Sequence, residues 1–118
     1  LTKHVAIRNA TYGVRANVIL PGLVNTPTAV ERRVAKFGLS YEEVVAQRDK
    51  EVPLRHKMGT AWDVAYASVF LASDEANFIT GIEMPVDGGQ SVQVGRMPSP
   101  AEAAEELAAA QAAAVTVE

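Results

Sequence analysis

From Val18 to Pro27 the chain reads Val-Ile-Leu-Pro-Gly-Leu-Val-Asn-Thr-Pro. The run from Val18 to Leu20 is apolar throughout, which is typical of a strand buried on both faces in a parallel sheet. Pro21-Gly22 predicts a turn at the carboxyl end of this strand, and Thr26-Pro27 predicts a helix N-cap and first position. Because ligands of open α/β sheets bind outside the carboxyl ends of strands, we expect a ligand-binding loop at residues 21–26.

Composition and charge exclude several classes of protein. The 118 residues are enough for one small domain, and their net charge of −3 argues against nucleic acid or an anionic membrane as partner. The chain has no cysteine, and its two histidines, His4 and His56, lack metal-ligand spacing, so we expect no disulfide, no metal site and surface positions for both. No run approaches ~18 apolar residues, and no signal peptide is recognised, so we expect a cytoplasmic protein.

Two short helices are expected directly after the predicted ligand loop. Residues 27–37 form the first, which ends at Gly38. Ser40 and Glu43 make a capping box that starts the second over 41–50. These helices could close over the loop as a lid hinged at Gly38, or could form a helical hairpin that covers the sheet, and the sequence favours neither.

The other elements of residues 1–95 alternate between helix and strand. They are a helix over 1–11 capped by Gly13, an extended connector at 52–54, a helix from Thr60 with Asp63 at its third position, and a strand over 82–86 closed by the turn 87–89. Small and apolar residues on a broad face of the helix after Thr60 predict burial from two directions, as at a packed or oligomeric interface. Pro85 has no donor N–H, which indicates a strand at a sheet edge.

The chain is expected to be part of a larger protein. A strand, a helical crossover and a second strand make a unit whose strands are normally parallel. Two parallel strands cannot bury their own faces, so this α/β unit is incomplete on its own. The chain also begins at Leu1, without methionine and inside a helical pattern.

Residues 96–118 differ from the rest in composition. Met97-Pro-Ser-Pro100 reads as a linker, and Ala101–Ala114 is alanine-rich with glutamates near its start. This segment has strong helix propensity but little to bury, so we expect a helical or disordered tail that frays. A helix that docks on a partner is the alternative.

Four motifs in order resemble the C-terminal part of the short-chain dehydrogenase/reductase family, over roughly residues 1–91. They are Gly13-Val-Arg-Ala-Asn17 with Pro21-Gly-x-Val-x-Thr26; Met58-Gly-Thr-x-x-Asp63-Val-Ala65 with Phe70-Leu-Ala-Ser-Asp74; Ile79-Thr-Gly81; and Val86-Asp-Gly-Gly89. The resemblance implies the last two strands of a Rossmann-type, doubly wound parallel sheet with their flanking helices. It also implies NAD or NADP as cofactor, an alcohol or ketone substrate, and a homo-oligomer, either a tetramer or a dimer.

Carried over by position, the resemblance assigns the nicotinamide-binding loop to Pro21, Gly22, Val24 and Thr26. A turn N–H and C=O can pair with the carboxamide, and a threonine hydroxyl can do the same or reach a phosphate. Thr26 is expected to cap the following helix whether or not its hydroxyl also contacts the cofactor. Residues 27–50 would be the substrate lid. Val34, Phe37 and Met58 would either contact substrate or, the favoured role, pack in the core.

The family's catalytic motif is missing from these residues. Tyr12, Tyr41 and Tyr66 are followed four residues later by Ala16, Val45 and Phe70, so there is no Tyr-x-x-x-Lys, and no glycine-rich pyrophosphate loop occurs. Without the lysine there is no tuned general acid, so we assign no catalytic residue and expect no activity from this chain alone.

Three hypotheses follow from the sequence. The first is the C-terminal portion of an NAD(P)-dependent oxidoreductase that acts on a small alcohol or ketone or on a 3-oxoacyl thioester. The second is a non-catalytic module that completes another chain's sheet or oligomer interface. The third is a gene remnant without function.

Overall fold

The fold of residues 1–115 is described by a computed structural model, and residues 116–118 of the predicted tail lie outside the described residues. Helices and strands alternate along the chain. In order they are α1 Thr2–Asn9, η1 Ala10–Tyr12, β1 Val18–Pro21, β2 Val24–Asn25, α2 Pro27–Phe37, α3 Tyr41–Asp49, β3 Gly59–Thr60, α4 Ala61–Ala72, η2 Asp74–Ala76, β4 Glu83–Val86, η3 Gln90–Val92 and α5 Pro100–Val115.

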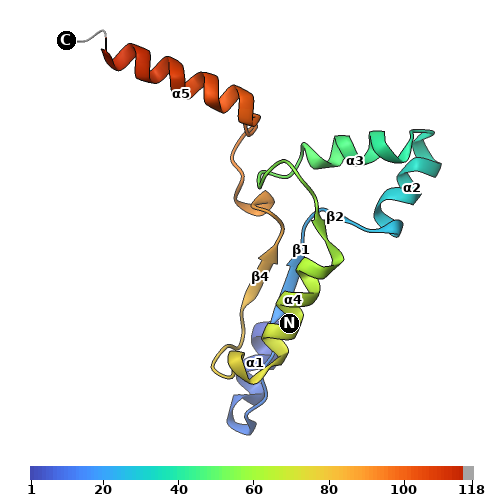
Figure 1. Cartoon of the computed structure of the whole chain (residues 1–118). Helices are drawn as coiled ribbons and strands as arrows, with labels where there is room; N and C mark the ends of the chain where they lie inside the picture. The colour runs from blue at the N-terminus through green and yellow to red at the C-terminus, as the bar shows by residue number, and fades with distance from the viewer. Residues whose placement is uncertain (116–118) are drawn as a thin grey trace.

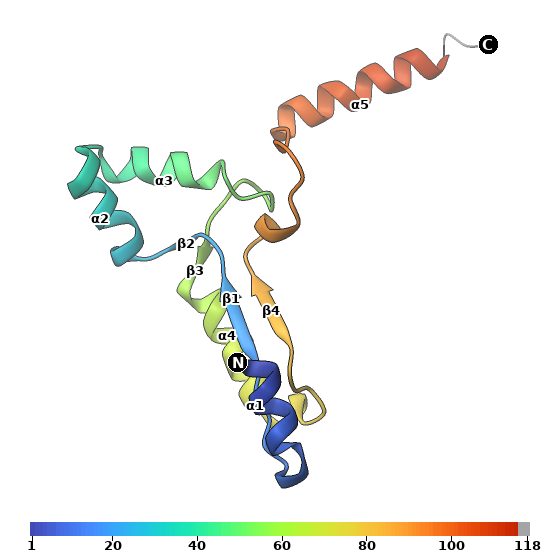
Figure 2. The same cartoon turned by 180° about the vertical axis from the view of Figure 1, so that it is seen from behind.

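The predicted strand–crossover–strand unit is confirmed. β1 and β4 pair in parallel with a register that runs from Val18 opposite Glu83 to Pro21 opposite Val86. Figures 1 and 2, which view the chain from opposite sides, show α4 and α1 on opposite faces of this pair. This arrangement of helices on both faces of parallel strands is that of a doubly wound α/β sheet.

β1 is less buried than its apolar sequence predicts. Val18 and Ile19 are half-buried, whereas Leu20 is 45% exposed and Pro21 is also exposed. The prediction of burial on both faces was therefore wrong within this chain, because one helix covers each face and the second edge of β1 has no strand beside it among residues 1–115. The Cα radius of gyration is 20.1 Å, against about 13 Å for a compact domain of this length, and Figures 1 and 2 show that α5 and the helices α2 and α3 extend away from the strands.

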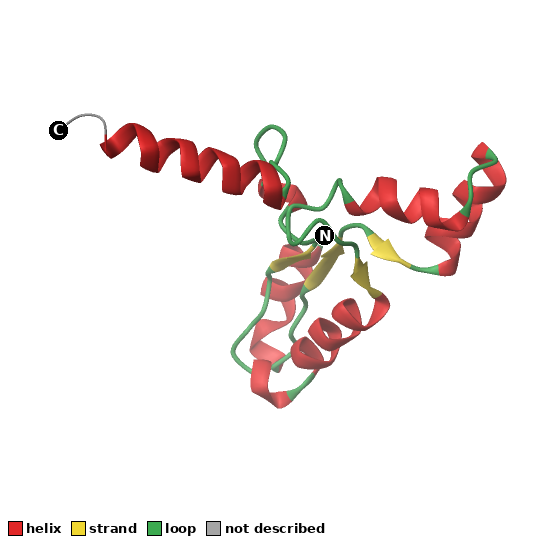
Figure 3. Cartoon of the chain, turned by 45° about the horizontal axis from the view of Figure 1, so that its top comes forward, coloured by secondary structure: helices red, strands yellow, loops and turns green. Residues whose placement is uncertain are grey.

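The helices α2 and α3 form a hairpin with a small core of its own. Val30 and Val44 meet Val52 and Met58 in this core, and all four side chains are buried. The predicted caps are confirmed: Thr26 Oγ1 accepts from Ala29 N at 3.3 Å, and the Ser40 capping box is complete. Figure 3 shows that the hairpin projects to one side of the strands and α5 to the other.

The connector at residues 52–54 is a turn and not the predicted extended segment. Leu54 N donates to Gly88 O at 3.0 Å, and Lys57 N donates back to Leu54 O. Arg55 and His56 take positive φ values of 59° and 45°, a conformation that side chains disfavour. The contact with Gly88, 34 residues later in the sequence, gave no local signal from which this turn could be predicted.

The helix α4 begins as predicted but buries less than predicted. Thr60 and Asp63 form a reciprocal capping box, in which the shorter Asp63 side chain still reaches Thr60 N at 2.6 Å. Leu71 is the only buried residue of α4, and Trp62 and Tyr66 are more than two-thirds exposed. Burial from two directions is thus not found within the chain.

The C-terminal end of α4 is tied to β1 by one arginine. Arg15 Nη1 donates to Leu71 O at 2.7 Å and to Ile79 O at 3.4 Å, and its Nη2 donates to Ser73 O at 3.2 Å. These carbonyls end α4 or precede β4, so one half-buried guanidinium fixes the crossover helix against the start of the sheet.

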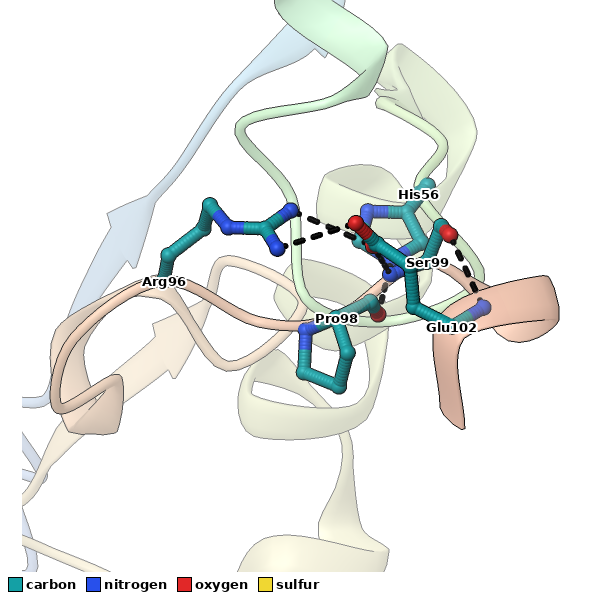
Figure 4. A network of polar contacts seen from close by, with 5 residues as sticks. All are labelled: His56, Arg96, Pro98, Ser99 and Glu102. Carbon is teal, nitrogen blue, oxygen red and sulfur yellow. Dashed lines mark hydrogen bonds and ion pairs between the residues drawn. The ribbon is translucent and has the colours of Figure 1, made fainter. Parts of the chain in front are cut away.

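The tail leaves the body of the chain as a helix, and polar contacts anchor its start (Figure 4). Ser99 and Glu102 cap α5 reciprocally, and Glu102 also pairs with Arg96 at 3.0 Å. His56 Nε2 lies 3.0 Å from Pro98 O, so this predicted surface residue is half-buried against the linker. None of the helices in residues 1–115 is long and apolar enough to cross a membrane.

Acid should loosen this anchor. Hydrogen bonding from Arg96, and then from Ser99, lowers the pKa of Glu102 from 4.5 to about 2. A carboxyl whose pKa is lower in the folded chain stabilises the fold fully above its unfolded pKa and loses that contribution as pH falls toward 2. We expect the Glu102 carboxyl carbon in ¹³C NMR to titrate near pH 2, and the Arg96→Gln variant to move its midpoint upward. An ordinary midpoint near 4.5 in the unchanged chain would contradict the anchor.

Candidate functional site

The predicted ligand loop lies at the carboxyl ends of β1 and β4. Gly22 N donates to Val86 O at 3.0 Å and so extends the β1–β4 ladder by one bond. Leu23 N donates to the side-chain oxygen of Gln90 at 2.8 Å. The loop is therefore fixed to the turn after β4, and Gln90 is a positioning residue that the sequence analysis missed.

A second parallel ladder holds the other side of the loop. β2 pairs with β3 so that Val24 lies opposite Gly59 and Asn25 opposite Thr60. Gly59 N donates to Leu23 O at 3.1 Å. Because hydrogen bonds in a parallel pair alternate along each strand, Val24 directs its own N–H and C=O away from β3.

Only glycine fits at position 22. A Cβ built there would lie 2.5 Å from Asp87 Cβ, 2.6 Å from Asp87 Cα and 2.6 Å from Gln90 Oε1. Separations this short require the backbone to move, because two of the three neighbours belong to Asp87 close to its main chain. Gly22 thus permits the close approach between the loop and the turn after β4.

The turn after β4 is itself held by one carboxylate. Asp87 accepts from Gly89 N at 2.9 Å and from Ser91 N at 2.8 Å. Hydrogen bonding from the Ser91 side chain, then from the Ser91 and Gly89 N–H groups, holds the pKa of Asp87 below its usual value. Asp87 is therefore ionised at neutral pH, and it fixes the turn that presents Gln90 to Leu23.

Two open hollows adjoin the loop and share Leu23. One of about 670 Å³ is lined by residues that include Val24, Gly59 and the turn from Asp87 to Gly89. The other, of about 510 Å³, is lined by residues that include Pro21 and Gly22.

The four predicted cofactor residues are thus distributed around one loop. Pro21 and Gly22 line the smaller of the two hollows and Val24 the larger, whereas Thr26 lines neither and caps α2. Their contacts with a cofactor remain predictions.

The three residues predicted for substrate contact or core packing differ in their surroundings. Met58 is buried in the hairpin core and Val34 packs against that core, which agrees with the favoured packing role. Phe37 is 59% exposed, with Lys36 Nζ 5.2 Å from its ring centre.

The site contains hydrogen-bonding groups suited to binding a ligand. The Val24 N–H and C=O supply one donor and one acceptor, and the Thr26 hydroxyl keeps its hydrogen free to donate while its oxygen accepts from Ala29 N. No group of three or more metal-ligating side chains gathers within the described part of the chain.

Comparison with known proteins identifies the family. Residues 1–91 match the family model described as enoyl-(acyl carrier protein) reductase. A 2,5-dichloro-2,5-cyclohexadiene-1,4-diol dehydrogenase of Sphingobium indicum is 38% identical over 94 residues, which are 80% of this chain and 34% of the relative. The chain belongs to the short-chain dehydrogenase/reductase family, as the resemblance of its motifs implied.

Solved structures agree with this assignment. A short chain dehydrogenase family protein from Francisella tularensis superposes with a TM-score of 0.71 and 34% identity, over 78% of this chain and 39% of that chain. The NADP-bound structure of ElxO has a TM-score of 0.65 and 33% identity, over 78% of this chain and 35% of that one. The Rossmann-type fold is thus confirmed, and the chain spans about a third of the length of the curated relatives it matches.

Proposed function

We propose that this chain forms the C-terminal part of the cofactor domain of an NAD(P)-dependent oxidoreductase. Its substrate would be a small alcohol or ketone, with a 3-oxoacyl thioester as one case. Family membership and the NADP-bound relative support the cofactor, and the diol dehydrogenase supports an alcohol substrate.

The observation that carries the proposal is the direction of the Val24 peptide groups. Both hydrogen-bonding groups of Val24 point away from β3, at the carboxyl end of a parallel sheet, where nucleotide cofactors bind. A carboxamide needs one donor and one acceptor in this arrangement, and the fixed loop supplies both. The nicotinamide, when bound, accepts or gives the hydride, and Val24 would hold its ring in one orientation.

The other loop residues have matching roles in the proposal. Pro21 ends the strand, and Gly22 lets the loop pack against Asp87, so contacts within the chain hold the loop in place. Thr26 can donate its hydroxyl hydrogen to a carboxamide or a phosphate at the start of α2, where the helix dipole also favours negative charge.

We further propose that these 118 residues do not catalyse hydride transfer alone, because they contain no Tyr-x-x-x-Lys. The test compares turnover by the 118-residue chain with turnover by the product of the complete reading frame, using NADH or NADPH and simple ketones. We expect reduction by the complete product only. Turnover by the 118-residue chain, or none by a folded complete product on any ketone or 3-oxoacyl thioester, would contradict the proposal.

An assembly function is the second candidate, and one observation favours it. Trp62, Tyr66 and Val69 recur along one side of α4, and all three are more than two-thirds exposed. Exposed apolar groups at helical spacing are typical of a surface that another chain or segment covers. These residues support a homo-oligomer, either a dimer or a tetramer. The turnover comparison described above separates an oxidoreductase from a purely structural module.

The proposed partners and location follow from composition. A net charge of −3 gives no basis for binding nucleic acid or anionic lipid, and the absence of cysteine suits a reducing compartment. We therefore propose a cytoplasmic protein that acts on a small molecule.

A further inference from the structure

A small cavity within the α2–α3 hairpin contains two arginines. It has a volume of about 200 Å³ and is lined by residues that include Leu23, Arg33, Leu39, Val44, Arg48 and Glu51. Leu23 also lines both hollows beside the cofactor loop, so this cavity adjoins the loop at Leu23. It contains none of the four predicted cofactor residues.

Arg48 is buried without an ion pair among residues 1–115. The residue is 7% exposed, and the one hydrogen bond of its side chain within these residues runs from Nε to the thioether sulfur of Met58, a weak acceptor, at 3.2 Å. No carboxylate of the described chain lies within 4.0 Å of Arg48 or of Arg33. A buried guanidinium normally pairs with an acidic group, because desolvation of an unpaired charge is costly.

The free donors of Arg48 are accessible. No inaccessible side-chain nitrogen or oxygen in the described residues lacks a hydrogen-bond partner, so Nη1 and Nη2, which have no protein acceptor, keep accessible surface. Arg48 is one of the residues that line the cavity. Burial, and then the nearby Arg33, lower the pKa of Arg48, and the Glu51 carboxylate offsets part of this shift.

We propose that this cavity binds the anionic group, a carboxylate or a phosphate, of a small ligand. Two arginines against the single carboxylate of Glu51 leave the lining with a net positive charge, and planar guanidinium groups match both kinds of anion in a bidentate manner. Leu23, Leu39 and Val44 form an apolar part of the lining, where the effective dielectric constant is lower and attraction between charges is stronger than in open water.

Because Leu23 lines both the cavity and the hollows beside the cofactor loop, one substrate molecule could reach both. A small alcohol or ketone with an acidic group could place that group in the cavity and its reacting carbon near the cofactor loop. This extension rests on the proposed function, whereas the anion site itself does not.

The test titrates the natural gene product with inorganic phosphate and, separately, with acetate, at an ionic strength held constant with sodium chloride and without cofactor. The readout is the ¹⁵N NMR signal of the Arg48 Nε–H. We expect saturable shifts with one anion or both, and the anion that binds assigns the ligand class.

Variants locate the site. Arg33→Gln, followed by the Arg48 Nε–H signal, should weaken binding at least tenfold. Arg48→Gln removes that signal, so its binding is followed by the backbone amide signal of Val44 in the cavity lining, and it should weaken binding at least tenfold too. Arg33 is exposed, so its variant keeps the test valid if Arg48→Gln fails to fold. Arg32→Gln, next to Arg33 on α2 but outside the cavity lining, is the matched control and should bind as before. No saturable shift in the unchanged protein, or equal loss in Arg32→Gln, would overturn the proposal. Because no cofactor is present, failure here is distinguishable from failure of the oxidoreductase proposal.

Discussion

Replacing Gly22 with alanine is expected to destabilise the chain by about 3 kcal/mol and to weaken NAD(P)H binding at least tenfold. The new Cβ would come within 2.6 Å of Asp87 and Gln90 atoms, so the loop would have to move away from the turn after β4. That movement would break the bonds from Gly22 N to Val86 O and from Leu23 N to Gln90 Oε1. Urea unfolding and a fluorescence titration with NAD(P)H measure the two effects on the natural gene product.

Gly38→Ala is the matched control for this change. Nothing lies within 4 Å of a Cβ at Gly38, and its φ of +65° costs an alanine only the left-handed strain of about 1–2 kcal/mol. It should leave cofactor affinity unchanged, because Gly38 ends α2 at a distance in sequence from the loop. If Gly22→Ala lowers stability and NAD(P)H affinity no more than Gly38→Ala does, the close packing of the loop against Asp87 contributes to neither.

Replacing Arg15 with methionine is expected to cost about 2–4 kcal/mol of stability. The guanidinium is half-buried and donates to three backbone carbonyls, those of Leu71, Ser73 and Ile79. Methionine keeps most of the side-chain volume but removes every donor, so carbonyls that end α4 or precede β4 lose a charged partner. Chemical unfolding of the natural gene product measures the loss.

Arg32→Met serves as the comparison, since Arg32 is exposed on α2 and should change stability by less than about 0.5 kcal/mol. Amide hydrogen exchange adds a second readout: Arg15→Met should speed exchange in α4 and β4 more than in α2. Equal losses of stability in Arg15→Met and Arg32→Met would mean that Arg15 stabilises the fold no more than an exposed arginine does.

Local chemistry explains which parts of the fold were predictable. The caps at Thr26, Ser40 and Thr60 depend on residues within three positions of each other, so their signals survive in a single sequence. The parallel pairing of β1 with β4 followed from the general handedness and order of strand–helix–strand units.

Contacts between distant residues explain what was missed. β2 and β3 are two residues each and exist only because Val24 meets Gly59, so neither has a hydrophobic pattern. The role of Gln90 depends on a loop 67 residues earlier, and the turn at residues 52–56 depends on Gly88. The site shows the same contrast. The loop motif predicts Pro21, Gly22, Val24 and Thr26, but the distant groups that position them leave no pattern near it in the sequence.

The most direct test of the account is a saturation-transfer NMR measurement on the natural gene product with NAD(P)H bound. Irradiation of the Val24 methyl groups should transfer saturation to the nicotinamide ring protons more strongly than to the adenine protons. A matched irradiation of the Val69 methyl groups, exposed on α4, should transfer to neither. If the nicotinamide protons receive no saturation from Val24 while the cofactor is bound, the loop from Pro21 to Thr26 does not hold the ring, and the account is wrong.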